Sequence, residues 1–228
     1  MKAGKKELRR DLADFARAFG MDAALDFNDE RKRMAIMVSK YDHCLYDLFL
    51  RQQYGEINAH IALVASNHPD LAPVAANFNT PFFCVPVHKD TKAEAEAQTL
   101  ELFEAHGVDF IVLARYMQVL TPLTVERYRH RIINVHHGFL PAFKGAKPYH
   151  QAYERGVKLI AATSHYVTEE LDMGPIIKQE AVQVDHTHSV GDLIRMGRDI
   201  EKRALAGAVC AHADGRIMLY RHRTIVFD

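Results

Sequence analysis

The chain has 228 residues, of which 48% are hydrophobic, so it can bury the core of one large α/β domain or of two small ones. Its 29 basic side chains balance 29 acidic ones, which argues against nucleic acid or an anionic membrane as the main partner. The three cysteines lie far apart without a CxxC spacing, which favours reduced thiols in a cytoplasmic protein over disulfides or a cysteine zinc site.

The first expected element is an amphipathic helix over residues 7–20. Apolar side chains recur there at helical spacing, and Gly20 supplies a stop signal. The basic residues before it run into acidic ones, so they are no secretory signal, and no segment reaches the roughly 20 apolar residues that span a bilayer. A polar, turn-rich stretch over 26–32 follows. We therefore expect an N-terminal helix and linker over 1–32 and one α/β domain over 33–228.

Apolar, β-rich runs then alternate with helical patterns. This alternation predicts an open, twisted, mostly parallel sheet with helices on both faces, as in Rossmann-like folds. Two long β-rich runs at 159–167 and 176–184 predict an antiparallel pair that closes the sheet, before a helix over 189–212 and a hairpin around Leu219 and Ile225. The other expected strands are 34–38, 61–65, 82–87, 110–113 and 132–135, and the helices between them are 43–53, 69–77, 91–106 and 122–130.

Polar side chains end the strand expected at 132–135. Asn134 and His136 are two residues apart, so on a strand they point to the same face and could hold a developing oxyanion. Asp172 lies in the turn between the two long strands and could act as a base or set the charge of the imidazole. The plainer interpretation is a polar strand end and a turn carboxylate without a catalytic role. The apolar flanks of the Asp172 turn favour the catalytic interpretation.

Other common sites are not indicated by the sequence. The fourteen histidines show no recognisable metal-ligand spacing, and HExxH, P-loop and dinucleotide motifs are absent. Cys44 is expected to be a buried structural thiol. The segment from Ser39 to Leu45 contains no glycine, so it offers no nest of backbone N–H groups for a phosphate. Ser39, Lys40 and His43 could still bind something smaller, and we predict no metal and no cofactor.

Several ordered motifs resemble one superfamily. Segments 133–136, 140–145 and 167–177 resemble the formyltransferase superfamily, whose members use 10-formyltetrahydrofolate. Segments 38–40, 43–45, 66–68, 136–137, 145–152 and 197–201 are similar to the formyltetrahydrofolate deformylase family within it. The resemblance covers essentially the whole chain and implies a formyltransferase-like fold.

The resemblance also implies an activity, namely hydrolysis of 10-formyltetrahydrofolate to formate and tetrahydrofolate, which supplies purine biosynthesis and balances one-carbon folates. It implies a catalytic trio of Asn134, His136 and Asp172. It places the pterin against the segment 115–120, although Met117, Val119 and Leu120 could equally be core residues. The further substrate contacts expected are Gln118, His137, Gly138, Leu171, Ser39, Lys40 and His43.

Two departures from the family pattern stand out. Glycine occupies position 138, where serine is expected, and this could loosen the turn without touching the trio. Family members usually carry an N-terminal regulatory domain of the ACT type, of which only a helix like its linker, residues 7–20, is expected here. We therefore do not carry over the family's regulation, and we expect methionine and glycine to leave the rate of these 228 residues unchanged.

Two other functions remain open. A formyltransferase that uses an amine such as glycinamide ribonucleotide would share the fold, but the glycine-free segment 39–45 argues against it. A non-catalytic folate-binding sensor would need to lack one of the trio, and all three are present. The sequence thus predicts a cytoplasmic hydrolase whose partner is a small folate, with no nucleic acid or membrane partner, in a homo-oligomer. It does not decide whether Asp172 acts on water directly or through His136.

Overall fold

A computed structural model describes residues 4–21, 23, 25–27, 29–88, 90–142 and 148–227 of the chain. The chain divides into two compact units, residues 1–31 and 32–228. Within the described part, no helix is long and apolar enough to cross a bilayer. Residues 143–147, which belong to two of the motifs named above, lie outside the described residues. The domain boundary at residue 32 stays a prediction from the sequence.

The first unit holds one helix, α1 (Lys5–Ala18), as predicted. Lys5 pairs with Asp29 at 2.5 Å, and Arg9 pairs with Glu30. Both cations also lie over the ring of Phe27. These contacts fold the segment after α1 back onto the helix within this unit.

The second unit alternates strands and helices in the predicted order. Its strands are β1 (Lys32–Val38), β2 (Ala59–Ser66), β3 (Phe82–Cys84), β4 (Phe110–Leu113), β5 (Ile132–His136), β6 (Leu159–Tyr166), β7 (Ile176–Gln183), β8 (Ile217–Tyr220) and β9 (Arg223–Val226). Its helices are α2 (His43–Gln53), α3 (Ala72–Asn77), α4 (Lys92–Ala105), α5 (Pro122–Arg127), α6 (Pro148–Glu154) and α7 (Val190–Ala213).

Seven strands form one sheet in the order β3-β2-β1-β4-β5-β6-β7. The strands β1 to β5 are parallel, and β6 and β7 are each antiparallel to their neighbours. The predicted mostly parallel sheet and its closing antiparallel pair are therefore confirmed, as is the hairpin of β8 and β9. In parallel strands the carboxyl ends meet at one edge, where α/β folds bind ligands.

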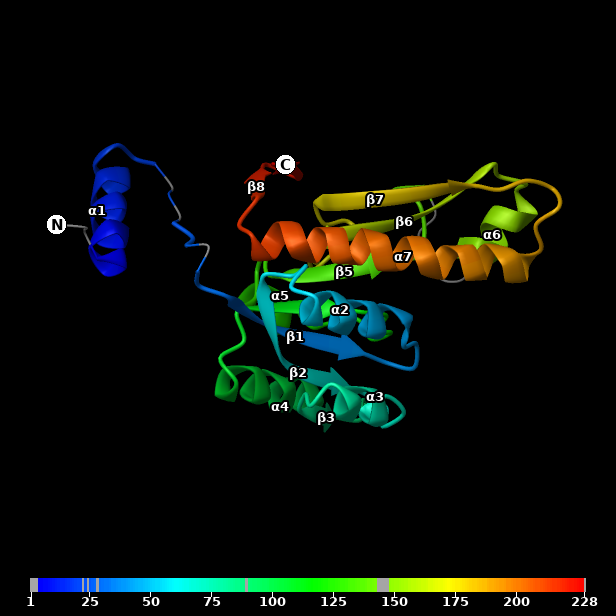
Figure 1. Cartoon of the computed structure of the whole chain (residues 1–228), viewed down its shortest axis with the longest axis horizontal. Coiled ribbons are helices and arrows are strands. Elements are labelled where there is room, and N and C mark those ends of the chain that lie inside the picture. Colours follow the sequence, from blue (N-terminus) through cyan, green and yellow to red (C-terminus); the bar gives the residue numbers. More distant parts are fainter. Residues whose placement is uncertain are drawn as a thin grey trace. The chain divides into compact units, whose positions relative to one another are not determined.

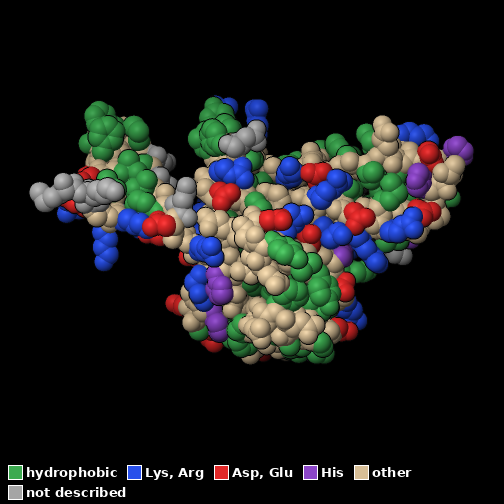
Figure 2. Space-filling view, viewed as in Figure 1, with side chains coloured by type: hydrophobic (Ala, Val, Ile, Leu, Met, Phe, Trp, Pro, Cys, Tyr) green, Lys and Arg blue, Asp and Glu red, His purple; other side chains and the backbone are tan. Residues whose placement is uncertain are grey.

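Helices cover both faces of the sheet, because the strands are apolar on both sides. In β1, Met34, Ile36 and Val38 point into the larger core with α2, α3 and α7. Ala35 and Met37 point into the second core with α4 and α5. Figure 1 shows α7 running along β5 to β7. On its outer side acidic and basic side chains are interspersed, so this face carries no field of one sign (Figure 2).

Four elements differ from the sequence prediction. The strand expected at 82–87 ends at Cys84, since Pro86 has no N–H to continue the ladder. The helix expected at 69–77 begins only at Ala72, after Pro69. The helix expected at 122–130 ends at Arg127, and His130 adopts a left-handed conformation with φ 59°. The short helix α6 was not predicted, because two turns give little periodicity to detect.

Candidate active site

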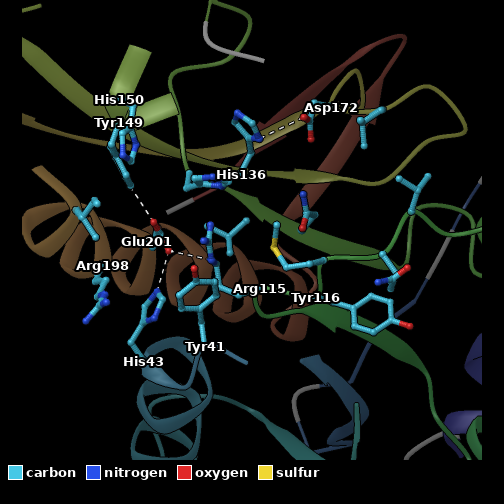
Figure 3. Close-up of a pocket in the computed structure, with 18 residues that line it drawn as sticks. Tyr41, His43, Arg115, Tyr116, His136, Tyr149, His150, Asp172, Arg198 and Glu201 are labelled. Carbon is cyan, nitrogen blue, oxygen red and sulfur yellow. Dashed lines mark hydrogen bonds and ion pairs between the residues drawn. The ribbon is translucent and has the colours of Figure 1, made fainter. Parts of the chain in front are cut away.

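A cavity of about 480 Å³ lies beside the carboxyl ends of β4 and β5 (Figure 3). Its volume is within the range of small-molecule sites. Asn134, His136 and Asp172, the three residues predicted to act together, all line it. His136 and Asp172 lie on one side, and a network around Glu201 lies on the other (Figure 3).

Strand β5 and its partner β6 position the polar groups at the sheet edge. Asn134 pairs with His165 in the antiparallel ladder, and its amide Nδ2 lies 3.3 Å from His165 Nε2. His165 Nδ1 lies 2.9 Å from the carbonyl oxygen of Tyr166, which can only accept, so Nδ1 donates. Nε2 of the same ring is in contact with Asn134 Nδ2. This contact fixes the Asn134 amide with one further N–H to donate.

The Asp172 turn brings a carboxylate to the same place. Asp172 Oδ2 lies 3.2 Å from His136 Nδ1, and Asp172 Oδ1 lies 3.6 Å from His165 Nε2. The turn folds tightly against the end of β6: a Cβ on Gly174 would lie 1.6 Å from the carbonyl oxygen of Tyr166. Asp172 itself has φ 56°, a conformation that aspartate tolerates better than most residues. Glycine at 174 is thus a steric requirement for the position of Asp172.

The two imidazoles determine the charge of Asp172. Burial alone would raise the pKa of this carboxyl, since it disfavours the charged form. The contacts with His136 and His165 outweigh burial and hold the pKa of Asp172 well below its ordinary value. His136 and Asp172 are 5% and 8% exposed, so bulk water screens their interaction little. The site therefore holds an ionised carboxylate against a buried imidazole.

Other predicted contacts also line this cavity. Met117, Gln118 and Val119 line it together with Leu171 and His137. Leu120 lines a smaller adjoining pocket of about 80 Å³ instead, and its side chain is buried.

His136 and His137 both line the cavity, although neighbouring residues on a strand would point to opposite faces. Strand β5 ends at His136, so the strict alternation stops there and both rings line the cavity, 5.4 Å apart. Burial lowers the pKa of His137 to about 4, with a further contribution from Arg115. His137 is therefore uncharged near neutral pH.

Three predicted contacts lie away from the main cavity. Gly138 borders a different, very small pocket, and its carbonyl accepts a hydrogen bond from Thr163 Oγ1. Ser39 is buried, with its hydroxyl engaged inside the protein. Lys40 is exposed and does not line the cavity. Their substrate contacts stay predictions that this geometry does not favour.

A buried ion network forms the opposite wall. Glu201, 2% exposed, accepts from Tyr149 Oη and interacts with His43 Nε2, each at 2.8 Å, and Arg115 Nε lies at 3.6 Å. Burial would raise the pKa of Glu201, but these partners outweigh it and lower the pKa. A Cβ on Gly197 would lie 2.2 Å from the Tyr149 ring, so glycine there lets the ring reach Glu201.

Part of the site could not be predicted from the sequence. His165 lies on β6. Its contact with Asp172 depends on the register between β5 and β6, which the sequence does not give. The lining side chains without a predicted role are Tyr41, Val135, Tyr149, His150, Ile194, Arg198 and Glu201. The last five lie on α6 and α7, more than a hundred residues after the end of β1.

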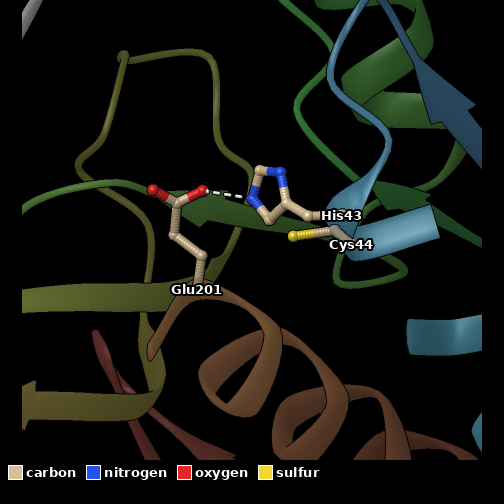
Figure 4. A group of neighbouring side chains, drawn as sticks. All are labelled: His43, Cys44 and Glu201. Atoms are coloured by element: carbon tan, nitrogen blue, oxygen red, sulfur yellow. Dashed lines mark hydrogen bonds and ion pairs between the residues drawn. The ribbon is translucent and has the colours of Figure 1, made fainter. Parts of the chain in front are cut away.

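Among the described residues, His43, Cys44 and Glu201 offer three possible metal ligands within 4.8 Å of one another (Figure 4). The chemistry of this group does not favour a metal. Burial and the charge of Glu201 raise the pKa of the Cys44 thiol, whereas metal binding needs the thiolate. The Arg115 cation also lies beside the carboxylate. The absence of a metal stays a prediction.

Comparisons with known proteins bear on the family. A family model described as formyl transferase matches residues 32–209. A formyltetrahydrofolate deformylase of Bacillus subtilis is 49% identical over 224 residues, which are 98% of this chain and 75% of that protein. The chain belongs to the formyltetrahydrofolate deformylase family. The family resemblance found in the motifs is thereby confirmed.

Solved structures agree with this assignment. A formyltetrahydrofolate deformylase from Pseudomonas syringae matches with a TM-score of 0.97 at 44% identity, over 100% of this chain and 76% of that one. The glycinamide ribonucleotide transformylase 1 of Symbiobacterium toebii matches with a TM-score of 0.82 at 29% identity, over 90% of this chain and 99% of that one. The formyltransferase-like fold is confirmed, and the deformylase family shares it with enzymes named for transfer.

Proposed function

We propose that this chain hydrolyses 10-formyltetrahydrofolate to formate and tetrahydrofolate. Membership of the deformylase family supports this reaction. The observation that carries it is the convergence of Asn134, His136 and Asp172 on one cavity, although the turn and the strand end lie about thirty-five residues apart. We assign these three residues the catalytic role.

The chemistry of a formamide requires such groups. Resonance stabilises its carbonyl, so the negative charge that forms on oxygen during attack must meet fixed donors. Asn134 Nδ2 supplies one donor throughout, and the His136 ring supplies a second once it has taken up the proton of water; one such donor is worth roughly 2.7–4 kcal/mol. Water adds its oxygen to the formyl carbon and loses a proton to a base. The C–N bond then breaks, N10 takes up a proton, and formate leaves.

The low pKa of Asp172 favours one of two routes for this proton. A general base is most effective when its pKa lies near the working pH, and the pKa of Asp172 lies far below it. Asp172 is therefore a weak final acceptor but a strong electrostatic partner for a positive ring. We propose that the carboxylate orients His136 and stabilises its protonated form, while the proton of water passes to the imidazole.

The side chains around the end of β1 support water as the acceptor. His43, in the first turn of α2, is bound to Glu201, and Ser39 uses its hydroxyl inside the protein. The intervening residues have no glycine to expose a nest of N–H groups. A phosphorylated amine would find no binding site there comparable to a phosphate loop, so transfer to glycinamide ribonucleotide is the weaker alternative.

Formate release tests this proposal. The purified chain is given 10-formyltetrahydrofolate without an amine, and formate and tetrahydrofolate are both quantified. We expect equal amounts of the two products at a rate that depends on enzyme concentration. Folate binding without any turnover would contradict hydrolysis and would favour the sensor alternative.

The wider role follows from the products. We propose that the formate supplies purine biosynthesis and that the tetrahydrofolate restores the balance of one-carbon folates. No metal or cofactor is required by the steps above. The cytoplasmic location and the homo-oligomeric assembly stay predictions from the sequence.

A further inference from the structure

The segment from Arg115 to Thr121 leaves the sheet at the end of β4 and forms one wall of the cavity. The ladder ends at Ala114, whose N–H donates to the carbonyl of Met37. Arg115 then turns the chain with φ 65°, a costly conformation for a residue with a side chain. Something other than the sheet must therefore hold the following residues in place.

Buried groups hold the first part of this segment. The Ser39 hydroxyl, 3% exposed, accepts the Met117 backbone N–H at 3.0 Å and donates to Asn67 Oδ1 at 2.7 Å. Asn67, after β2, is 8% exposed. Three neighbouring strand ends are thus linked by one buried hydroxyl, whose single O–H is used inside the protein.

A buried carboxylate holds the last part. Glu96 of α4 is 6% exposed, and it accepts from the Thr121 N–H, the Thr121 hydroxyl and the Thr124 hydroxyl. These distances run from 2.6 to 3.0 Å. Thr121 begins α5, so Glu96 also caps the N-terminus of that helix from another element.

Between these anchors the backbone is open to a ligand. Within the described part of the chain, no hydrogen bond involves the backbone N–H of Gln118 or Val119. Met117 and Val119 are 55% and 53% exposed, so packing of their side chains does little to order the backbone. Without anchors, a ligand would have to order about five residues when it binds, and the lost conformational entropy would lower its affinity.

We propose that Ser39 with Asn67, and Glu96 with Thr121, are positioning residues that hold the segment 116–120 in its binding conformation. This inference rests on the proposed function only in taking a folate as the ligand. Loss of an anchor lowers the fraction of molecules in which segment 116–120 has its binding conformation. The apparent affinity falls in proportion to that fraction. The trio is left in place, so the chemical step is not affected.

Ser39→Ala and Glu96→Gln test the two anchors. Thr99→Ala is the matched control, because Thr99 is a buried residue of α4 whose hydroxyl, among the described residues, bonds to Ala95 of its own helix alone. We expect each anchor variant to raise KM about threefold to tenfold, with kcat within about twofold, because each loses at least one hydrogen bond that holds the segment. Hydrogen exchange of the amides in 116–121 should accelerate in both variants, while Thr99→Ala changes neither measure.

The exchange measurement separates this inference from the proposed function. If the wild type does not hydrolyse the folate, the function fails, yet exchange still decides whether the anchors hold the segment. Unchanged exchange in both anchor variants would overturn the inference. A fall in kcat without a rise in KM would also overturn it, since the residues would then act on the chemical step. If one variant does not fold, the other decides.

Discussion

At the scale of single residues, the central feature is a carboxylate whose charge is fixed by two imidazoles. Asp172 stays ionised although it is 8% exposed, because His136 and His165 lie within 3.6 Å. A buried charge is tolerated only when its partners compensate for lost hydration. The same arrangement gives the His136 ring a fixed orientation toward the cavity.

Asp172→Asn is the most direct residue-level test. The substitution keeps the size of the side chain but removes its charge, so it should lower kcat at least a hundredfold and leave tetrahydrofolate affinity within about threefold. Glu170→Gln also removes a carboxylate charge from the same turn, but Glu170 is exposed, so this variant should retain the wild-type rate. Steady-state kinetics with a tetrahydrofolate titration measures both. A variant with more than a tenth of wild-type kcat would refute the assigned role.

The pKa of His137 predicts how stability depends on pH. It falls from 6.5 to about 4 on folding, so between these pH values the unfolded chain binds the extra proton. Stability is therefore full above about pH 6.5 and is lost as pH falls toward 4. Between pH 7 and pH 4.5 this group should cost the wild type on the order of 2 kcal/mol of its free energy of unfolding, and His137→Gln should not show this loss. Urea unfolding at the two pH values measures it. Exposed His60→Gln is the control, and an equal loss in all three proteins would contradict the prediction.

At the scale of elements, the tight turn after β6 places Asp172. A Cβ on Gly174 would collide with the Tyr166 carbonyl at 1.6 Å, and backbone cannot move aside cheaply. Gly174→Ala should therefore lower kcat at least tenfold and destabilise the fold by about 1–3 kcal/mol. At Gly191, in the first turn of α7, a Cβ meets only Ser189 Oγ at 3.6 Å.

Gly191→Ala serves as the matched control for that turn. It should keep the wild-type rate and leave stability within about 1 kcal/mol, since alanine favours helix. Thermal unfolding and kcat, measured on both variants, compare the two glycines. Equal effects of the two substitutions would mean that general loss of glycine, not the collision at Tyr166, affects the site.

Element types and order could be predicted from the sequence, since they depend on local periodicity. The apolar runs of β1 and β2 and the long pattern of α7 are strong signals of this kind. The boundaries at Cys84 and Arg127 were misplaced, because proline and a left-handed residue ended those elements early. Local patterns carry no such tertiary detail.

The candidate site could be predicted only in part. Asn134, His136 and Asp172 were found because strand ends and a turn mark them locally. His165 and Glu201 join the site through strand register and helix packing, so segment 197–201, although singled out in the sequence, gave Glu201 no predicted role. Ser39 was expected at the ligand, but the fold turns its hydroxyl inward to Met117 and Asn67.

At the scale of the whole molecule, one fold serves both hydrolysis and transfer. The chain matches a transformylase structure with a TM-score of 0.82, so the sheet and its helices do not select the acceptor. In this chain His43 and Glu201, near the end of β1, close one wall of the cavity. The preference for water over an amine as acceptor therefore depends on side chains and not on the fold.

The fate of the formyl group tests this account most directly. The purified chain is incubated with formyl-labelled 10-formyltetrahydrofolate and an excess of glycinamide ribonucleotide, and labelled formate and labelled ribonucleotide are separated and counted. Because no phosphate nest is present at 39–45, we expect all label in formate and no change in rate when the amine is added. Label in formylglycinamide ribonucleotide would contradict the hydrolase and establish a transferase.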